Sequence, residues 1–414
     1  MNEVMTGEGG DLPIDGGDLP IASGGLPIVG GGLPIKVLHY TSLNYGMTGV
    51  ESFILQLSTA QKRAGAEPKI TLEIVRREAL VDAAEKIGVQ VVDFPKSVKL
   101  PAVKRLAGVL TSLRRIRALG KQLKGYDVLH MHSAGFTGLD ALVAAMLMRT
   151  PKVIVTHHMT VQSYRKYWRR LGSVTLWFLK RVADISVMPY DEAAQELVEV
   201  GMPANNVRVV PYCIDEIRFS GRNVPPAAGE PLKLIMVSRL HEGKGHDVLL
   251  DALSELQKKG RAVQLTIVGT GEKRAAIEEQ IQSLGLQSSV DLIQQVPHSA
   301  IPQLLREAHV IVLPSWMEGE TFPLCLLEGM LLGLPAIGAR WHGIPYIIED
   351  GDTGFLVTPK NSGELADAIE KFVVDPQIYP RMSEKARHRA QTFFTGKTVA
   401  GTYDSLYRGL PAAN

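Results

Sequence analysis

The sequence predicts an α/β protein made of two doubly wound domains that face each other across a cleft. From Lys36 onward, short apolar runs rich in β-branched residues alternate with helical stretches. This alternation is typical of a parallel sheet covered by helices on both faces. It pauses at the linker-like stretch 225–229, Pro-Pro-Ala-Ala-Gly, and then restarts. The length of 414 residues also suits two or three domains.

Residues 1–35 stand apart from this pattern. Leu-Pro-Ile recurs at positions 12, 19, 26 and 33, with glycine pairs between the repeats. Proline and glycine at this density oppose a helix, so we expect a disordered low-complexity tail with no catalytic role. The tail has five acids and no Lys or Arg, and it therefore lacks the basic start of a secretory signal. A short linear motif for a partner is the alternative.

The first domain is predicted to span 36–224. Helices are expected between its strands, for example at 49–64 and 163–181. Its strands are predicted at 36–40, 69–75, 89–94, 127–132, 152–157, 183–188 and 207–210.

The second domain is predicted to span 225–394. A last helix, at about 381–409, could cross back, so that residues 395–414 complete the first domain. The strands of the second domain are predicted at 232–238, 263–268, 290–293, 309–313, 335–338 and 354–357.

Composition excludes several classes of protein. Apolar residues make up 45% of the chain and charged residues 21%, which excludes a wholly disordered or fibrous protein. A net charge of +2 gives no field to attract nucleic acid. Two cysteines exclude a disulfide scaffold and favour the reducing cytoplasm. The longest apolar run, 322–339, contains Glu328; it predicts a buried helix and strand rather than a membrane span.

Open parallel sheets bind ligands at the carboxyl ends of their strands. After the strand 232–238 come Arg239 and then Lys244, with glycines at 243 and 245, before an apolar helix from Val248. Two cations beside a helix start fit a diphosphate. A solvated basic loop is the alternative.

The next strand ends in Gly269-Thr270-Gly271. A dinucleotide fingerprint needs a third glycine at position 274, where the chain has arginine, so a dehydrogenase is disfavoured. We expect Gly269 to form a tight turn that lines the cleft.

Two glutamates follow the strand 309–313. Glu320 is expected in the loop and Glu328 inside an apolar helix that starts near Pro323. A charge in such a helix needs a partner or a ligand hydroxyl. The pair fits two parts of a long polyhydroxylated ligand; a surface cap and a structural ion pair are the alternative.

The first domain carries weaker signals. Thr48 and Glu51 have the spacing of a capping box, and Gly49 between them lets the backbone approach a ligand. Histidines at 130, 132, 157 and 158 suggest zinc, but no Cys or acid at ligand spacing joins them, and we expect no metal.

In order, these motifs resemble the retaining glycosyltransferases of family four, which have the GT-B fold of two Rossmann-like domains. The resemblance covers about residues 36–400. The matching stretches of the second domain are Arg239, Lys244 to Asp247, Glu320 with Glu328, Gly343 to Pro345, Glu349 to Gly351 and Thr353-Gly354. Those of the first domain are Gly49 to Glu51, His130 to His132, Thr156 to His158, Ala183-Asp184 and Pro211 to Asp215.

The resemblance implies roles for the second domain. Arg239 and Lys244 would neutralise the leaving nucleotide diphosphate, and Glu328 would hold the ribose hydroxyls. Glu320, with the backbone N–H groups of Thr321 and Phe322, would hold the donor sugar. Gly269 would line the same donor site.

In the first domain, the resemblance implies that His158 lies beside the donor near the reacting centre. Gly49 would approach the phosphates or the acceptor. It also implies that no metal or other cofactor is needed, since the two cations serve the leaving group, and that the sugar is transferred with retention from a UDP- or GDP-sugar.

The chain departs from the family pattern at a few positions. Pro323 stands where many members have glycine and removes one N–H group. Tyr212 and Cys213 replace Asn-Gly, Thr48 replaces a glycine, and Tyr346 replaces a glutamate. These changes concern sugar identity more than activity.

The acceptor side is basic. Residues 96–124 contain nine Lys and Arg residues and no acid, with apolar residues at roughly helical spacing. A second basic and aromatic cluster occupies 165–170. Such a helix can lie on an anionic membrane, which favours a lipid-linked or glycan acceptor at the inner face of the plasma membrane. A solvated helix face is the alternative.

Two other functions stay open at this point. One is an epimerase or phosphorylase with the same two-domain cleft. The other is an inactive transferase that serves as a binding subunit in a polysaccharide assembly. The sequence names neither the sugar nor the linkage.

Overall fold

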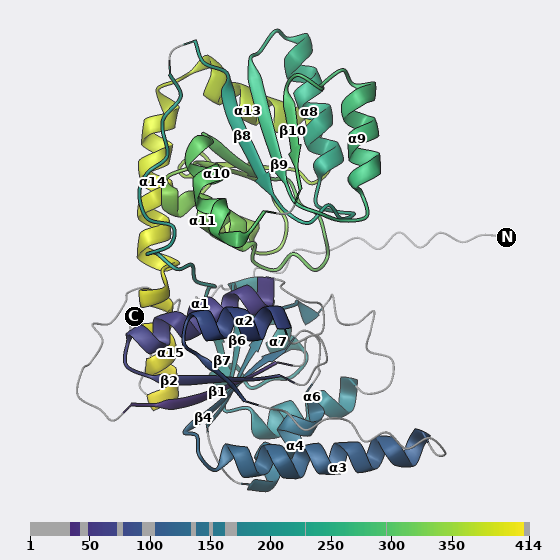
Figure 1. Ribbon diagram of the computed structural model, residues 1–414, viewed down its shortest axis with the longest axis vertical. Helices are drawn as coiled ribbons and strands as arrows, with labels where there is room; N and C mark the ends of the chain where they lie inside the picture. Colours follow the sequence, from purple (N-terminus) through teal and green to yellow (C-terminus); the bar gives the residue numbers. More distant parts are fainter. Residues whose placement is uncertain are drawn as a thin grey trace, which may run out of the picture.

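The structure, a computed structural model, describes residues 34–41, 49–72, 78–92, 104–133, 138–148, 152–161, 172–227, 229–294 and 296–409. The tail 1–33, Thr48 and the cluster 165–170 lie outside these residues. The described chain forms two all-parallel sheets with helices on both sides, one above the other in Figure 1. The prediction of two doubly wound domains is confirmed.

The first sheet has seven strands in the order β3-β2-β1-β4-β5-β6-β7. Its elements are β1 (Lys36–Thr41), α1 (Gly49–Arg63), β2 (Glu67–Leu72), α2 (Glu78–Lys86), β3 (Gln90–Val92), α3 (Lys104–Leu123), β4 (Val128–Ser133), α4 (Leu139–Met148), β5 (Lys152–His157), α6 (Gly172–Val182), β6 (Ile185–Met188), α7 (Asp191–Glu199), η1 (Ala204–Asn206) and β7 (Val207–Val209).

The second sheet has six strands in the order β10-β9-β8-β11-β12-β13. The strands and helices of this domain are β8 (Leu232–Val237), α8 (His246–Lys258), β9 (Val263–Val268), α9 (Arg274–Ser283), β10 (Val290–Ile293), η2 (His298–Ala300), α10 (Ile301–Glu307), β11 (Val310–Leu313), α11 (Leu324–Leu332), β12 (Ala336–Ala339), α12 (Ile344–Ile347), β13 (Gly354–Val357), α13 (Ser362–Val374) and α14 (Ile378–Phe393). The chain then continues into α15 (Gly396–Arg408).

Central strands of both sheets are buried along their whole length. Every residue of β4 and of β11 is buried. Burial on both faces explains why β11, Val-Ile-Val-Leu, is apolar without alternation, whereas β4 also buries His130, His132 and Ser133. In each sheet the strand order changes direction beside the first strand, at β1/β4 and β8/β11. Such switch points place a ligand at the carboxyl ends of the strands.

The prediction of one helix over 381–409 is wrong. The chain forms α14 and α15 with a break at Phe394 and Thr395. Thr395 is extended, and its side chain accepts a hydrogen bond from the backbone N–H of Thr398, at 3.2 Å. This cap starts a new helix, and the buried Phe394 anchors the break.

The two segments that link the domains lie side by side at this break. Ile214 donates its N–H to the carbonyl of Phe394 at 2.8 Å, and Gly396 donates to the carbonyl of Ile214 at 2.9 Å. From there α14 runs along the second domain, while α15 packs against α1 of the first (Figure 1).

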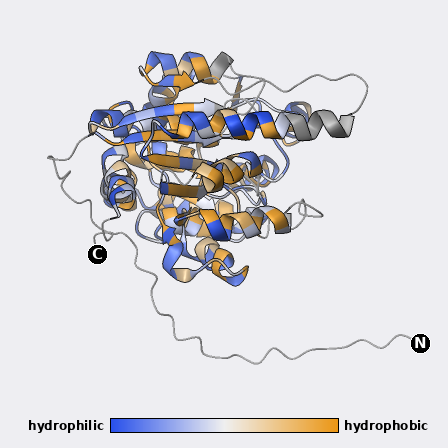
Figure 2. Cartoon of the chain, turned by 90° about the horizontal axis from the view of Figure 1, so that it is seen from below, coloured by the Kyte–Doolittle hydropathy of each residue, from blue (hydrophilic) through white to orange (hydrophobic). Residues whose placement is uncertain are grey.

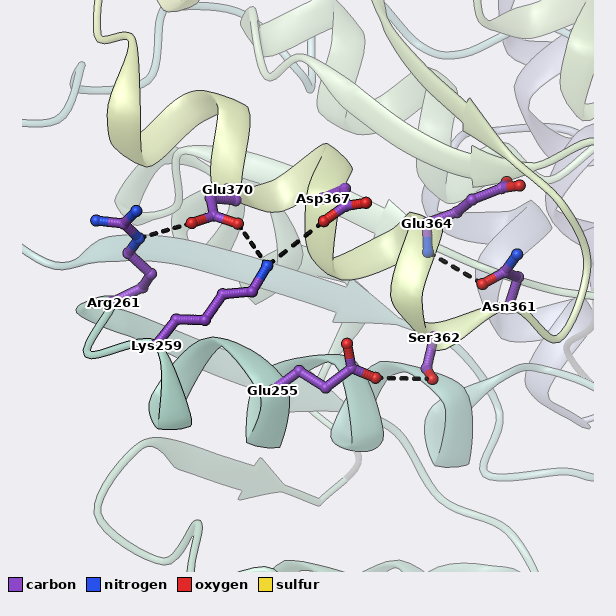
Figure 3. A network of polar contacts seen from close by, with 8 residues as sticks. All are labelled: Glu255, Lys259, Arg261, Asn361, Ser362, Glu364, Asp367 and Glu370. Carbon is purple, nitrogen blue, oxygen red and sulfur yellow. Dashed lines mark hydrogen bonds and ion pairs between the residues drawn. The ribbon is translucent and has the colours of Figure 1, made fainter.

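An ion-pair network joins α13 to the end of α8 on the surface of the second domain (Figure 3). Glu370 pairs with Lys259 at 2.7 Å and with Arg261 at 2.8 Å, and Ser362 donates to Glu255 at 3.2 Å. These contacts lie away from the strand ends that carry the predicted site, so we assign them to packing of the two helices.

Among the described residues, no helix is long and apolar enough to cross a membrane. The apolar run 322–339 forms α11 and β12, the buried helix and strand that the sequence predicts.

Candidate active site

The predicted residues of the second domain gather at the carboxyl ends of β8, β9 and β11. This edge of the sheet faces the first domain. The Thr321 hydroxyl donates to the backbone carbonyl of His158 at 2.8 Å. The rings of Phe322 and Tyr212 also lie together, with centroids 5.5 Å apart. The site is therefore built where the two domains meet.

Lys244 and Glu320 form a buried ion pair between the loops that follow β8 and β11. Each side chain is 9% exposed. Burial of two charges is costly unless they are paired, and here each neutralises the other. The sequence placed both residues at strand ends but did not predict that they touch.

The Lys244 loop fits only because the residue after it is glycine. Gly245 is in the left-handed conformation, and a Cβ on it would lie 2.3 Å from the carbonyl oxygen of Pro314. Gly245 caps α8, which starts at His246, two residues earlier than predicted. The close approach brings the loops after β8 and β11 together.

Arg239 is exposed at the same edge and forms no ion pair with any residue the structure describes. The backbone N–H groups of Thr321 and Phe322 likewise donate to no acceptor in the described part of the chain. Pro323 is the cap of α11 rather than a residue of its first turn. The edge therefore offers a guanidinium and two N–H groups to an anionic or polar ligand.

Glu328 is buried inside α11, as predicted, and it has a partner. Its Oε1 lies 3.3 Å from Nε2 of His298, a residue of η2 that was not predicted from the sequence. The guanidinium of the half-buried Arg218 also interacts electrostatically with the Glu328 carboxylate. Glu328 and Glu320 lie on one helix and its preceding loop, but they contact different partners.

His158 is fully buried, and both of its ring nitrogens are bonded within the first domain. Nδ1 lies 2.5 Å from the Tyr212 hydroxyl, and Nε2 lies 3.1 Å from Nδ1 of His132. Burial lowers the pKa of His158 to about 3, with a smaller contribution from His157. His158 is therefore neutral at pH 7, and it reaches the second domain through its backbone carbonyl.

Two predicted glycines have different surroundings. Gly269 must be glycine, because a Cβ there would lie 1.9 Å from the carbonyl oxygen of Ser238, where the ends of β8 and β9 converge. Gly49 begins α1, and a Cβ there would meet nothing within 4 Å. The structure brings Gly269 to the strand-end cluster and leaves the role of Gly49 a prediction.

Three histidines lie close enough to hold a metal ion. The ligand nitrogens of His39, His130 and His132 lie within 4.8 Å of one another. All six ring nitrogens are already hydrogen-bonded to side chains. Because no ring nitrogen has a lone pair free to bind a metal ion, we interpret the cluster as a hydrogen-bonded network rather than a metal centre.

Two buried polar atoms near Glu320 make no hydrogen bond with the described residues. They are Nε1 of Trp316 and Nε2 of His342, in the loops after β11 and β12. His342 also has a left-handed backbone, with φ of 46°. Strain of this kind is concentrated at functional sites. In the sequence, the histidine directly before Gly343 was the available signal for this position.

Two family models match nearly all of both domains. "Glycosyl transferases group 1" matches residues 218–389, and "Glycosyltransferase Family 4" matches residues 47–218. The chain belongs to this glycosyltransferase family. The resemblance inferred from the motifs is thereby confirmed.

Curated relatives of this glycosyltransferase are distant. An alpha-D-kanosaminyltransferase of Streptomyces kanamyceticus is 25% identical over 72% of the chain and 82% of the relative. The putative colanic acid biosynthesis glycosyltransferase WcaL of Escherichia coli is 29% identical over 56% of the chain and 58% of its own length. The chain thus spans little more than half of that second relative.

Solved structures confirm the GT-B fold. Anabaena Alr3699/HepE in complex with UDP superposes with a TM-score of 0.76 at 20% identity, over 91% of the chain and 100% of that structure. A glycosyltransferase from Rickettsia africae gives 0.74 at 21% identity, over 91% and 98%.

Proposed function

We propose that this glycosyltransferase moves a sugar, with retention, from a nucleotide-diphosphate sugar to a glycan or lipid-linked acceptor. The observation that carries the proposal is the buried Lys244–Glu320 pair, whose lysine lies in a loop that also carries the exposed Arg239. Cleavage of a sugar–diphosphate bond leaves negative charge on phosphate. Fixed cations aimed at that charge stabilise the transition state more than the ground state.

The same edge supplies the other groups that a donor needs. Glu320 accepts hydrogen bonds from sugar hydroxyls, and the N–H groups of Thr321 and Phe322 donate to sugar or phosphate oxygens. Glu328 accepts from the ribose hydroxyls, in exchange for its contact with His298. In a front-face displacement the leaving phosphate takes the proton of the acceptor hydroxyl. Lys244 and Arg239 then take the place of a metal ion.

A UDP- or GDP-sugar is the proposed donor. HepE of Anabaena has this fold and was solved with UDP. The relatives from Escherichia coli and Erwinia amylovora are named for colanic acid and amylovoran biosynthesis, which supports a cell-surface glycan as the product. The family match disfavours the epimerase and phosphorylase alternatives.

We further propose that the first domain docks on an anionic membrane in the cytoplasm. Helices α3, α4 and α6 pack side by side and expose large apolar side chains; Leu113 is 58%, Leu147 63% and Trp177 50% exposed. Figure 2, seen from below, shows hydrophilic and hydrophobic residues side by side along the helices. Arg114 and Arg117 are exposed on α3.

One arginine of the predicted basic face points elsewhere. Arg115 lies 3.8 Å from Asp140 of α4, and both side chains are mostly buried. The basic surface on the described part of α3 is therefore narrower than the sequence suggests: it consists of Arg114, Arg117 and Lys121.

Substitution of Arg239 or Lys244 by alanine tests the donor site. Loss of one charge-stabilising group should lower turnover by about 10²–10³, measured as transfer from the nucleotide sugar that gives the largest thermal shift among UDP-, GDP- and ADP-sugars. Arg222→Ala is a matched control, because Arg222 is exposed and pairs with Glu384 away from the site. Near-normal turnover in both folded variants would refute the diphosphate role. A wild type that binds a nucleotide sugar without transfer or hydrolysis would indicate a binding subunit.

A further inference from the structure

A continuous chain of side-chain hydrogen bonds runs through the first domain from Tyr212 to α15. The Tyr212 hydroxyl contacts Nδ1 of His158, whose Nε2 contacts Nδ1 of His132. Nε2 of His132 contacts Nδ1 of His39 at 2.9 Å. Nε2 of His39 contacts Oε1 of Gln61 at 2.7 Å. All of these side chains are buried.

The chain continues from Gln61 into the last helix. Nε2 of Gln61 donates to the Tyr407 hydroxyl at 2.8 Å, and that hydroxyl contacts Nδ1 of His130 at 2.7 Å. Nε2 of His130 contacts Thr156, which contacts Tyr403, both at 2.8 Å. Residues of α1, three strands and α15 thus form one network.

The Gln61 amide determines which atom donates and which accepts in each hydrogen bond from His39 to Tyr212. A neutral imidazole has one N–H donor and one acceptor nitrogen, and desolvation lowers the pKa of His39 to about 4 and that of His132 well below 6.5. The Oε1 of Gln61 can only accept, so His39 must carry its proton on Nε2 and accept on Nδ1. His132 must then donate from Nε2.

The same logic extends to the domain interface. His132 accepts on Nδ1, so His158 donates from Nε2 and accepts on Nδ1 from the Tyr212 hydroxyl. The hydroxyl hydrogen of Tyr212 is thereby committed to His158. Only the lone pairs of its oxygen remain for other partners, on a ring that packs against Phe322 of the donor loop.

We propose that Gln61 and Tyr407 are positioning residues of the transferase site, which hold His158 as the neutral Nε2–H tautomer. Tyr407 matters because its hydroxyl accepts from Nε2 of the Gln61 amide, and loss of that hydrogen bond leaves the amide free to turn its other end toward His39. A fixed ring keeps the carbonyl of His158 in place for Thr321, the neighbour of Glu320. The inference rests on the proposed function, because in that function His158 has the place that the family resemblance implies, beside the donor sugar.

The test is a nitrogen NMR spectrum of protein labelled with ¹⁵N-histidine, which distinguishes protonated from bare ring nitrogens. The signals of His158 are assigned by their loss in His158→Gln. In the wild type we expect one species, protonated on Nε2 only. In Gln61→Met, and separately in Tyr407→Phe, we expect two tautomers of His158 and a turnover lower by about tenfold, the scale on which outer-shell partners of a functional histidine act.

Two buried control residues outside the network keep the test specific. Gln56→Met removes a glutamine of the same helix that accepts from the N–H of Asp215 at 2.7 Å. Tyr379→Phe removes a buried hydroxyl of α14 that accepts from the side-chain amide of Asn223. Both should leave the His158 spectrum and turnover unchanged.

Three results would overturn the proposal. One is wild-type His158 protonated on Nδ1 or on both nitrogens. Another is an unchanged His158 spectrum in both folded network variants. The last is a changed spectrum with normal turnover, which would make the network structural only. The spectra need no substrate, so a failure of the proposed transfer reaction itself would be recognised separately, as a wild type without activity.

Discussion

Acidification from pH 7 to pH 5 should destabilise the protein through its buried histidines. Burial lowers the pKa of His39 and of His157 to about 4, and that of His158 to about 3, from an ordinary value of 6.5. The unfolded chain takes up protons near pH 6.5, whereas the folded chain does so only near pH 4 and below. In this window the unfolded state binds more protons, so the free energy of unfolding falls as the pH falls.

The loss is large on the scale of protein stability. Each of these three histidines contributes roughly 2 kcal/mol to the difference in unfolding free energy between pH 7 and pH 5, or roughly 5–6 kcal/mol together. Whole domains are stable by roughly 5–15 kcal/mol. His130 and His132, whose pKa values burial also lowers, act in the same direction, so we expect the first domain to be markedly less stable at pH 5 than at pH 7.

Urea unfolding at pH 7, 6 and 5 and fixed ionic strength measures this effect. The slope of the unfolding free energy against pH gives the number of protons taken up. His157→Leu should remove about one proton from that number. Equal stability at pH 7 and pH 5, or identical slopes for wild type and His157→Leu, would refute the reasoning.

Three other outcomes are expected. Transfer activity should survive EDTA, because two cations serve the leaving group; a loss that a divalent ion restores would contradict this. Vesicle flotation should show binding to anionic but not neutral lipid, at about 1 kcal/mol per basic residue that reaches the surface, and serine at Arg114, Arg117 and Lys121 should abolish it. Arg115→Ser is the control, and we expect it to bind vesicles like the wild type. Equal flotation with anionic and neutral lipid would contradict membrane docking and would mean that the basic face of α3 is only solvated. His342→Gly should relieve roughly 1 kcal/mol of backbone strain and raise Tm by about 2–4 °C in calorimetry, and a lower Tm would contradict it.

The sequence predicted the features that repeat along the chain. A buried parallel strand is a short apolar run followed by a turn, so β5, β9 and β13 begin and end where predicted. Ligand-binding residues of parallel sheets follow the strand ends. Arg239 and Glu320 could therefore be predicted to lie at one edge of the sheet before it was known which strands are neighbours.

Features that depend on contacts between distant segments were not predictable. Lys244 and Glu320 are joined only once β8 and β11 become neighbours. Arg115 and Arg114 are both basic residues on one helix, and only the position of Asp140 decides which of them is buried. The hydrogen-bonded histidine network could not be predicted either, because His39 lies beside His130 only through the pairing of β1 with β4.

The place of α15 bears on how the protein is made. Its buried residues Val399, Tyr403 and Leu406 pack in the first domain, yet a ribosome synthesises them only after the second domain. Domains usually fold in the order in which they emerge. Here folding of the first domain cannot be completed until the second domain has been synthesised, because α15 has not yet covered the apolar face of α1. A stop codon after α14 would thus mainly destabilise the first domain, because that domain would lack α15.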